Sequence, residues 1–126
     1  MDQNADKICQ MLEDSERYYY ATLYSPSYKI PLYSAYTLDP ARSRISQLPI
    51  IFSGTIYDIG LLNPSSFQCG DGRAATFTKT NVAPVDACFN SDHWKNWERT
   101  LRGYLLKELV RDGDSAKAFI VTGYST

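Results

Sequence analysis

The sequence is poor in residues that bind transition metals, with one histidine, His93, and three cysteines, Cys9, Cys69 and Cys88. A structural zinc site takes four ligands, mostly cysteine and histidine. All three cysteines and the one histidine would have to converge to reach that number, which argues against zinc. An odd number of cysteines allows one disulfide and one free thiol, or a bridge to another molecule.

The sequence also lacks long hydrophobic runs and an excess of positive charge. No stretch approaches the roughly 20 apolar residues of a membrane-spanning helix. The net charge is −1, whereas proteins that grip nucleic acid through phosphates normally carry a basic face. A basic stripe could form on one helix, but acidic residues interrupt it (Lys95, Arg99, Arg102, Lys107 and Arg111, interleaved with Glu98, Glu108 and Asp112). We expect no membrane partner, and nucleic acid is not the favoured one.

Length and composition suit one globular domain covering residues 1–126, because 44% of the residues are apolar. The first residues, Met1-Asp2-Gln3-Asn4, contain neither the basic nor the apolar region of a signal peptide. A signal peptide already removed and a cytosolic protein are both open at this point.

Alternating and aromatic segments predict an antiparallel sheet. Residues 17–24 and 29–38 are expected to form a hairpin around the turn Ser25-Pro26-Ser27. Further strands are expected at residues 75–79 and 117–122, and a short strand or irregular segment at residues 50–56. The stretches 39–49 and 81–89 are expected to be a loop and a connection.

Helical spacing predicts two helices. Ile8, Met11 and Leu12 indicate a short helix within residues 6–15. A long helix should begin at a cap provided by Ser91 or Asp92, run to about residue 111 and end at Asp112-Gly113. Its expected apolar stripe consists of Trp94, Trp97, Leu101, Leu105 and Leu109. The predicted class is α+β, an antiparallel sheet with one long helix.

One segment resembles a nuclease motif. Tyr57-Asp58-Ile59-Gly60-Leu61-Leu62-Asn63-Pro64 is similar to Asp-Arg-Gly-His followed by Leu-Asn-Pro in the DNA/RNA non-specific endonuclease family, especially its secreted animal branch. Further similar segments lie on both sides of this motif, in the order in which the family has them (residues 8–10, 20–24, 30–36, 75–84, 89–90 and 120–123). The resemblance implies a ββα-metal fold, an extracellular location, and a family domain whose C-terminal part is absent here, so that the fold is truncated.

A second part of the resemblance is a set of residues that recur at intervals of four, namely Asn90, Trp94, Glu98 and Arg102. In the family the Asn binds the catalytic Mg²⁺, and positions four apart share one ridge of a helix. Such a ridge would offer oxygen ligands to a hard cation and a guanidinium to a phosphate. Structural alternatives stay open, because Asn90 could cap the helix and Glu98 could pair with Arg102.

The departures from the family lie on the acid–base side of the site. Leu61 replaces the histidine that acts as general base, Ile59 replaces the arginine, and Phe67 and Val85 replace a second His and a Gln. A leucine can neither accept a proton nor orient a water. We therefore expect a catalytically degenerate, secreted protein that serves as a binding, structural or defence module.

Two alternatives to that expectation stay open. The first is a residual Mg²⁺-dependent endonuclease in which His93 substitutes as base and Glu98 and Arg102 take part. The second is a non-catalytic nucleic-acid binder that contacts phosphate through Asn81 and Arg102, although Asn81 could equally fix a turn. Mg²⁺ bound weakly at Asn90 is the only expected cofactor.

The remaining expectations concern covalent links and partners. A Cys69–Cys88 disulfide would close a loop around residues 75–80 in an oxidising compartment. A truncated domain would leave a sheet edge or an apolar face uncovered. We therefore expect a homo-oligomer, or a partner chain that covers this surface.

Overall fold

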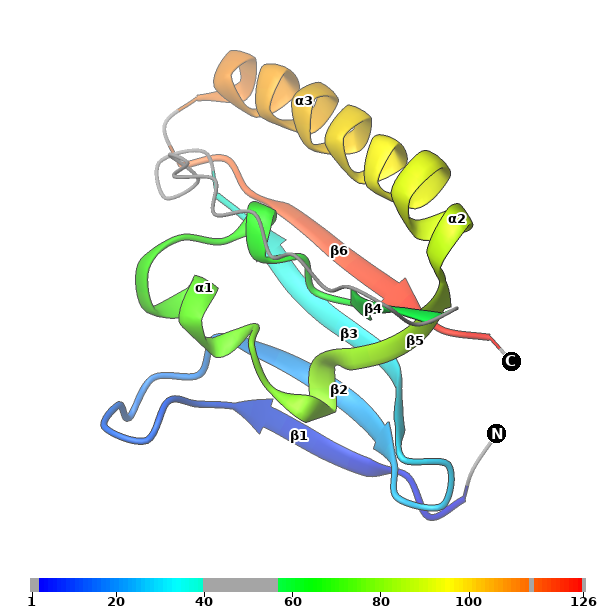
Figure 1. Cartoon of the computed structure of the whole chain (residues 1–126). Coiled ribbons are helices and arrows are strands. Elements are labelled where there is room, and N and C mark those ends of the chain that lie inside the picture. The colour runs from blue at the N-terminus through cyan, green and yellow to red at the C-terminus, as the bar shows by residue number, and fades with distance from the viewer. Residues whose placement is uncertain (1–2, 40–56, 114, 126) are drawn as a thin grey trace.

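The computed structural model describes residues 3–39, 57–113 and 115–125. It is an α+β fold, an antiparallel sheet with one long helix (Figure 1). The expected loop at residues 39–49 lies outside the described residues except for Asp39, and the expected segment at 50–56 lies outside them entirely.

The main sheet has four strands in the order β1-β2-β3-β6, and every neighbouring pair is antiparallel. The predicted hairpin and the predicted last strand are both present. The strands are β1 (Asp6–Gln10), β2 (Tyr20–Ser25), β3 (Ile30–Leu38) and β6 (Ala118–Gly123).

The helix predicted within residues 6–15 is wrong, because residues 6–10 form β1. This strand pairs with β2 in a register that sets Ile8 opposite Thr22. Ile8 and Gln10 are half-buried while Lys7 and Cys9 are exposed, so the period of two belongs to a strand. Pairing with β2 satisfies the backbone of this short segment, and this long-range contribution outweighs a weak helical spacing.

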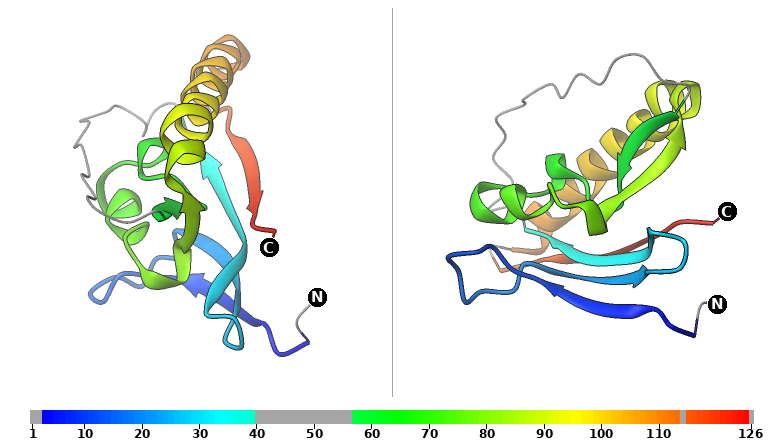
Figure 2. Two further views of the ribbon diagram at one scale, coloured as in Figure 1. Left: turned by 45° about the vertical axis from the view of Figure 1, so that its right-hand side comes forward. Right: turned by 60° about the horizontal axis from the view of Figure 1, so that its bottom comes forward.

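Helices and a second sheet lie on one face of the main sheet, and Figure 2 shows the two layers edge-on. Ser34, Tyr36 and Leu38 point from β3 into the interface and are buried. Phe67 packs edge-on against Tyr36, with ring centroids 6.2 Å apart. The rest of the core comes from β2, α1 (Gly70–Ala75), the long helix and β6 (Tyr20, Ala75, Leu101, Leu105, Leu109 and Ile120).

The second sheet is an antiparallel pair, β4 (Tyr57–Leu61) and β5 (Val82–Asp86). Two expectations are corrected here. Residues 75–79, expected as a strand, contain the end of α1, and the turn η2 (Lys79–Asn81) follows. The expected connection at 81–89 contains β5, whose backbone finds a long-range partner in β4. At Gly60, a Cβ would lie 2.5 Å from Cγ2 of Val85, so only glycine fits without displacing that side chain.

The long helix begins earlier than predicted. It runs through α2 (Ala87–Phe89), the π-helical turn η3 (Asn90–Trp94) and α3 (Lys95–Asp112). Asp86 is its cap, since this carboxylate accepts the N–H of Phe89 at 2.9 Å, and the predicted caps at Ser91 and Asp92 are wrong. The predicted end at Gly113 is confirmed, where φ is +112°.

The predicted apolar stripe of the helix is only partly right. Leu101, Leu105 and Leu109 pack on the core, but Trp97 is 54% exposed. Residues four apart are separated by about 400° of helix rotation, so each step drifts about 40° around the axis. Over three steps this drift carries Trp97 off the face that Leu109 buries.

Within residues 3–39, 57–113 and 115–125, no helix combines the length and apolar character that crossing a membrane requires.

Candidate functional site

The ridge expected to form the site lies on the long helix. Asn90 is only 2% exposed and has helical backbone angles, with φ −64° and ψ −47°. Its carbonyl accepts the N–H of Lys95, the i to i+5 bond of a π turn. Asn90 is therefore inside the helix, and the hypothesis that it caps the helix is wrong because Asp86 has that role. Single π turns occur often at functional sites.

Glu98 is the acid of the ridge, and its pKa is strongly shifted. Burial raises the pKa of its carboxyl to about 7, against a hydrogen bond from the Trp94 side chain and the charge of Lys95, both of which lower it. Tyr36, from the inner face of β3, interacts electrostatically with Glu98. The pKa of Tyr36 rises to about 12, mainly through burial, although its hydroxyl shares a 2.8 Å hydrogen bond with Thr122. Glu98 thus lies between the helix and the sheet.

Arg102 joins the helix to another element. Its Nε donates to the carbonyl of Ser66 at 2.8 Å, in the short 3-10 turn η1 (Ser65–Phe67). Burial lowers the pKa of Arg102, but an arginine stays charged in proteins. Arg102 therefore tethers α3 to η1, and the charge of Lys95 acts on Glu98.

The positions that differ from the nuclease motif lie on the strands and in the core. Leu61 ends β4, is half-buried and pairs with Val82. The backbone of Ile59 pairs with Pro84. Phe67 is 1% exposed and belongs to the core, so it has a packing role. None of these positions supplies a group that takes up a proton.

His93, the candidate substitute base, is exposed within the π turn. Its ring centroid lies 6.1 Å from that of Phe89. Residues three apart on a helix are neighbours, so Asn90 and His93 share one part of the helix surface, but Asn90 is buried and His93 faces solvent.

Asn81 fixes a turn, as one of its two predicted roles requires. It is fully buried, and its Oδ1 accepts the Asn63 N–H at 2.9 Å and the Ser34 hydroxyl at 3.1 Å. Its Nδ2 donates to the carbonyls of Asn63 and Thr76, both at 3.0 Å. These four bonds use the full capacity of the amide, which leaves no group free for a phosphate in this arrangement.

Sequence reasoning missed the polar neighbours of Asn81. Gln68 donates from Nε2 to Oδ1 of Asn63 at 3.2 Å and to the carbonyl of Thr37 at 2.9 Å. Among the described residues, Nδ2 of Asn63 is a buried side-chain donor without a partner. The Leu-Asn-Pro segment was a signal for Asn63, but nothing local to residue 68 or 37 indicates that they meet.

The described residues contain no group of three or more His, Cys, Asp or Glu side chains that could hold a metal ion. Cys9, Cys69 and Cys88 are free thiols in this structure. Cys69 precedes α1 and Cys88 lies in α2, and their pairing stays a prediction.

A hollow of about 380 Å³ lies away from the helix ridge. Its lining comes from the β1–β2 connection, the end of β3, the start of α1 and the residue before β6, and includes Arg17, Tyr18, Asp39, Cys69, Asp71 and Lys117. Asn90, Glu98 and Arg102 do not contribute to it. It is a concave surface with charges of both signs.

The chain matches no protein-family model, and no curated protein matches it either.

Proposed function

We propose that this chain is a nuclease-like domain of the ββα-metal type that has lost the nuclease reaction and serves outside the cell as a binding, structural or defence module. The observation that carries the proposal is Leu61, where the resembling nucleases have their general base. The order β4, β5 and long helix supports the ββα part, since the helix follows directly on the second strand of the pair.

The chemistry of the helix ridge agrees with a lost reaction. A carboxyl whose pKa is about 7 is partly protonated near neutral pH, which weakens Glu98 as a ligand for a hard cation. The nearby charge of Lys95 repels a cation further. Asn90 adds one neutral amide oxygen, so this donor set would hold Mg²⁺ weakly and fits a tightly bound ion poorly.

The test is to restore the missing base. Leu61→His alone, and combined with Ile59→Arg, should be assayed on plasmid DNA and RNA with Mg²⁺ beside the wild-type chain. We expect no detectable cleavage by the wild type. If the rest of the site still works, the histidine variants should cleave, because a positioned base raises the rate of hydrolysis on the order of 10²–10⁴-fold over the same site without it. Leu61→Gln is the matched control, because an amide is polar but cannot take up the proton.

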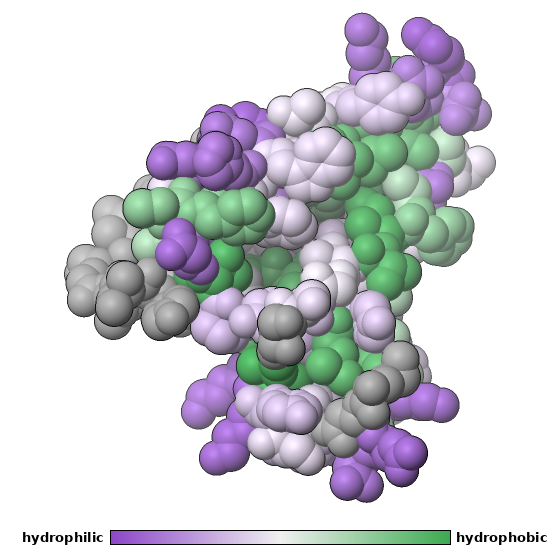
Figure 3. All heavy atoms as spheres, turned by 90° about the vertical axis from the view of Figure 1, so that its right-hand side faces the viewer, coloured by the Kyte–Doolittle hydropathy of each residue, from purple (hydrophilic) through white to green (hydrophobic). Residues whose placement is uncertain are grey.

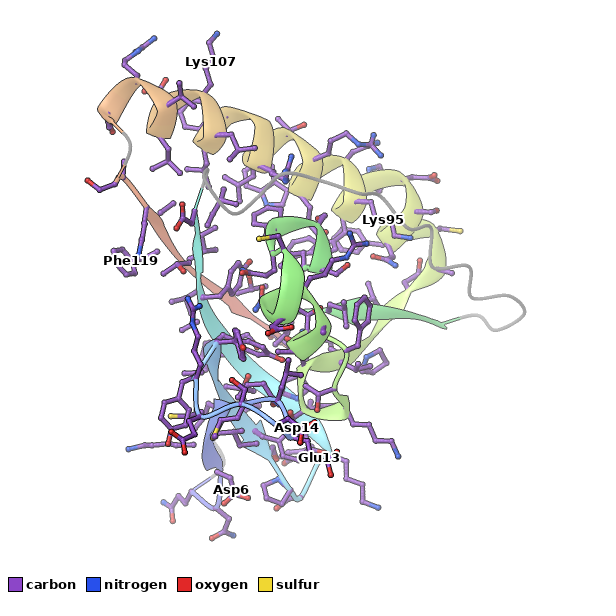
Figure 4. The ribbon with its side chains drawn as sticks, turned by 90° about the vertical axis from the view of Figure 1, so that its left-hand side faces the viewer. Asp6, Glu13, Asp14, Lys95, Lys107 and Phe119 are labelled. Atoms are coloured by element: carbon purple, nitrogen blue, oxygen red, sulfur yellow. The ribbon has the colours of Figure 1, made fainter. Side chains whose placement is uncertain are left out.

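Cleavage by the wild-type chain would contradict the proposal if it requires Mg²⁺ and is abolished by Asn90→Ala. The chain would then be a residual endonuclease, and a loss of activity in His93→Ala would identify the substitute base. Salt-sensitive binding of uncleaved DNA or RNA, weakened by Lys107→Ala, would instead favour a nucleic-acid binder. Lys107 points away from the body of the molecule in Figure 4.

A further inference from the structure

The strand β6 forms one edge of the main sheet. It pairs with β3, and among the described residues no strand pairs with its other side. Its six residues, Ala118–Gly123, contain no charge and no proline, two of the devices by which proteins prevent edge pairing. Phe119 is 85% exposed and Val121 is 67% exposed. Figure 4 shows the Phe119 side chain pointing away from the rest of the molecule.

The face of the sheet opposite the helices continues this apolar surface. Phe119 and Val121 lie opposite Thr37 and Ala35 of β3, and Tyr33 follows on the same face. Tyr33 is 43% exposed. The space-filling view in Figure 3 shows hydrophobic side chains at the narrow middle of the molecule, between the helix and the lower strands.

The backbone groups on the free side of β6 follow from the pairing with β3. The N–H of Tyr124 donates to the carbonyl of Leu32, in the same register as the pairs Ser34–Thr122 and Tyr36–Ile120. The even-numbered residues of β6 therefore direct their N–H and C=O groups to β3. In an antiparallel ladder the alternate residues direct theirs to the other side, so Phe119, Val121 and Gly123 present theirs at the free edge.

We propose that this edge pairs with β6 of a second copy of the chain, in an antiparallel register centred on Ile120. Phe119 of one copy then lies opposite Val121 of the other, and each such pair exchanges both of its N–H···O=C bonds. The two strands join into one continuous sheet around a twofold axis. In this register the exposed Phe and Val side chains of the two copies meet on the same face.

The choice of a second copy rests on complementarity. Aromatic and β-branched side chains opposite each other are favourable cross-strand pairs, and the proposed register makes two of them from the most exposed side chains of the strand. Lys117, which precedes β6, falls opposite Gly123 of the second copy, so no like charges meet. A net charge of −1 also leaves little long-range repulsion between copies.

The size of the contact predicts a weak dimer. A strand edge with two outward side chains buries less than the roughly 1,200 Å² typical of stable interfaces. Association should therefore depend on concentration in the micromolar to millimolar range. Sedimentation velocity over this range should show a reversible shift from monomer to dimer. A monomer at every concentration would overturn the proposal.

Hydrogen exchange measured by NMR at low and high concentration distinguishes edge pairing from any other dimer. The amides of Phe119 and Val121 should exchange fast when dilute and become protected on concentration. The amides of Ile120 and Thr122 should be protected throughout, because they already bond to β3. A dimer in which Phe119 and Val121 stay unprotected would contradict edge pairing and point to a face-to-face contact.

Two substitutions test the strand directly. Val121→Pro removes an N–H that faces the free edge, a position where a strand tolerates proline. Val121→Lys keeps the backbone and places like charges near each other in the dimer. Each should raise the dimer dissociation constant about tenfold or more. Val110→Lys is the matched control, since Val110 is 73% exposed on α3. Dimers unaffected by either Val121 variant would reject the proposal.

Discussion

Two polar side chains of this molecule, the fully buried Asn81 and the half-buried Glu98, differ in how burial is compensated. Asn81 makes four hydrogen bonds at 0% exposure. For Glu98, burial outweighs the hydrogen bond from Trp94 and the charge of Lys95, so its pKa rises to about 7. A neutral amide can replace every water it loses, whereas a carboxylate keeps part of its desolvation cost. Full compensation indicates a structural role, and the uncompensated acid is the better functional candidate.

The largest effect is expected at the compensated residue. Asn81→Ala would strand two acceptors and two donors in the interior, including the backbone of Asn63 and the Ser34 hydroxyl. We expect the free energy of unfolding to fall by about 3–5 kcal/mol, measured by urea denaturation. Asn96→Ala removes two exposed hydrogen bonds, one to the Asp92 carbonyl and one from the Arg99 side chain, and is the control. Equal losses of stability in the two variants would show that the hydrogen bonds of Asn81 matter no more than exposed ones.

The next largest effect depends on pH and concerns Glu98. Its pKa rises from 4.5 unfolded to about 7 folded, so below pH 4.5 both states hold the proton and burial has no ionic cost. As pH rises towards 7 the unfolded state ionises first, and the free energy of unfolding falls by an amount on the order of 3 kcal/mol. Glu98→Gln should remove this decline and be the more stable form at pH 8.

The comparison for Glu98 is the difference between variant and wild-type unfolding curves from pH 4 to pH 8. Glu108→Gln, on the same helix, is the control. In this variant the free energy of unfolding should still fall as pH rises, because Glu98 remains. A wild-type and a Glu98→Gln protein with parallel pH profiles would show that Glu98 ionises as easily folded as unfolded.

The smallest effect is expected at the helix tether. Arg102→Ala removes the bond from Nε to the Ser66 carbonyl, a charge-assisted contact at a partly exposed position. We expect the free energy of unfolding to fall by about 1 kcal/mol, measured from the shift of the thermal unfolding midpoint. Arg99→Ala, which breaks only an exposed bond to Asn96, should cost less. A larger loss at Arg99 than at Arg102 would remove the tethering role.

Local patterns predicted several elements correctly. The aromatic and β-branched residues of β2 and β3 around a Ser-Pro-Ser turn gave the hairpin, and Gly113 marked the end of the helix. The prediction failed for β1 and β5, whose partners lie elsewhere in the chain. It also failed for the helix start, because a carboxylate at Asp86 competes locally with Ser91 and Asp92 for the same role, and nothing in their spacing ranks them.

The candidate site shows the same contrast between what local sequence predicts and what long-range packing decides. The sequence by itself determined that Leu61 offers no base and that Asn90, Trp94, Glu98 and Arg102 recur at intervals of four. Only the tertiary structure decided that Asn90 is buried and Glu98 half-buried while His93 is exposed. It also decided that the Asn81 amide makes four hydrogen bonds within the fold. The physical reason is that a side chain's chemistry is local, whereas its desolvation depends on the strands and helices that pack around it.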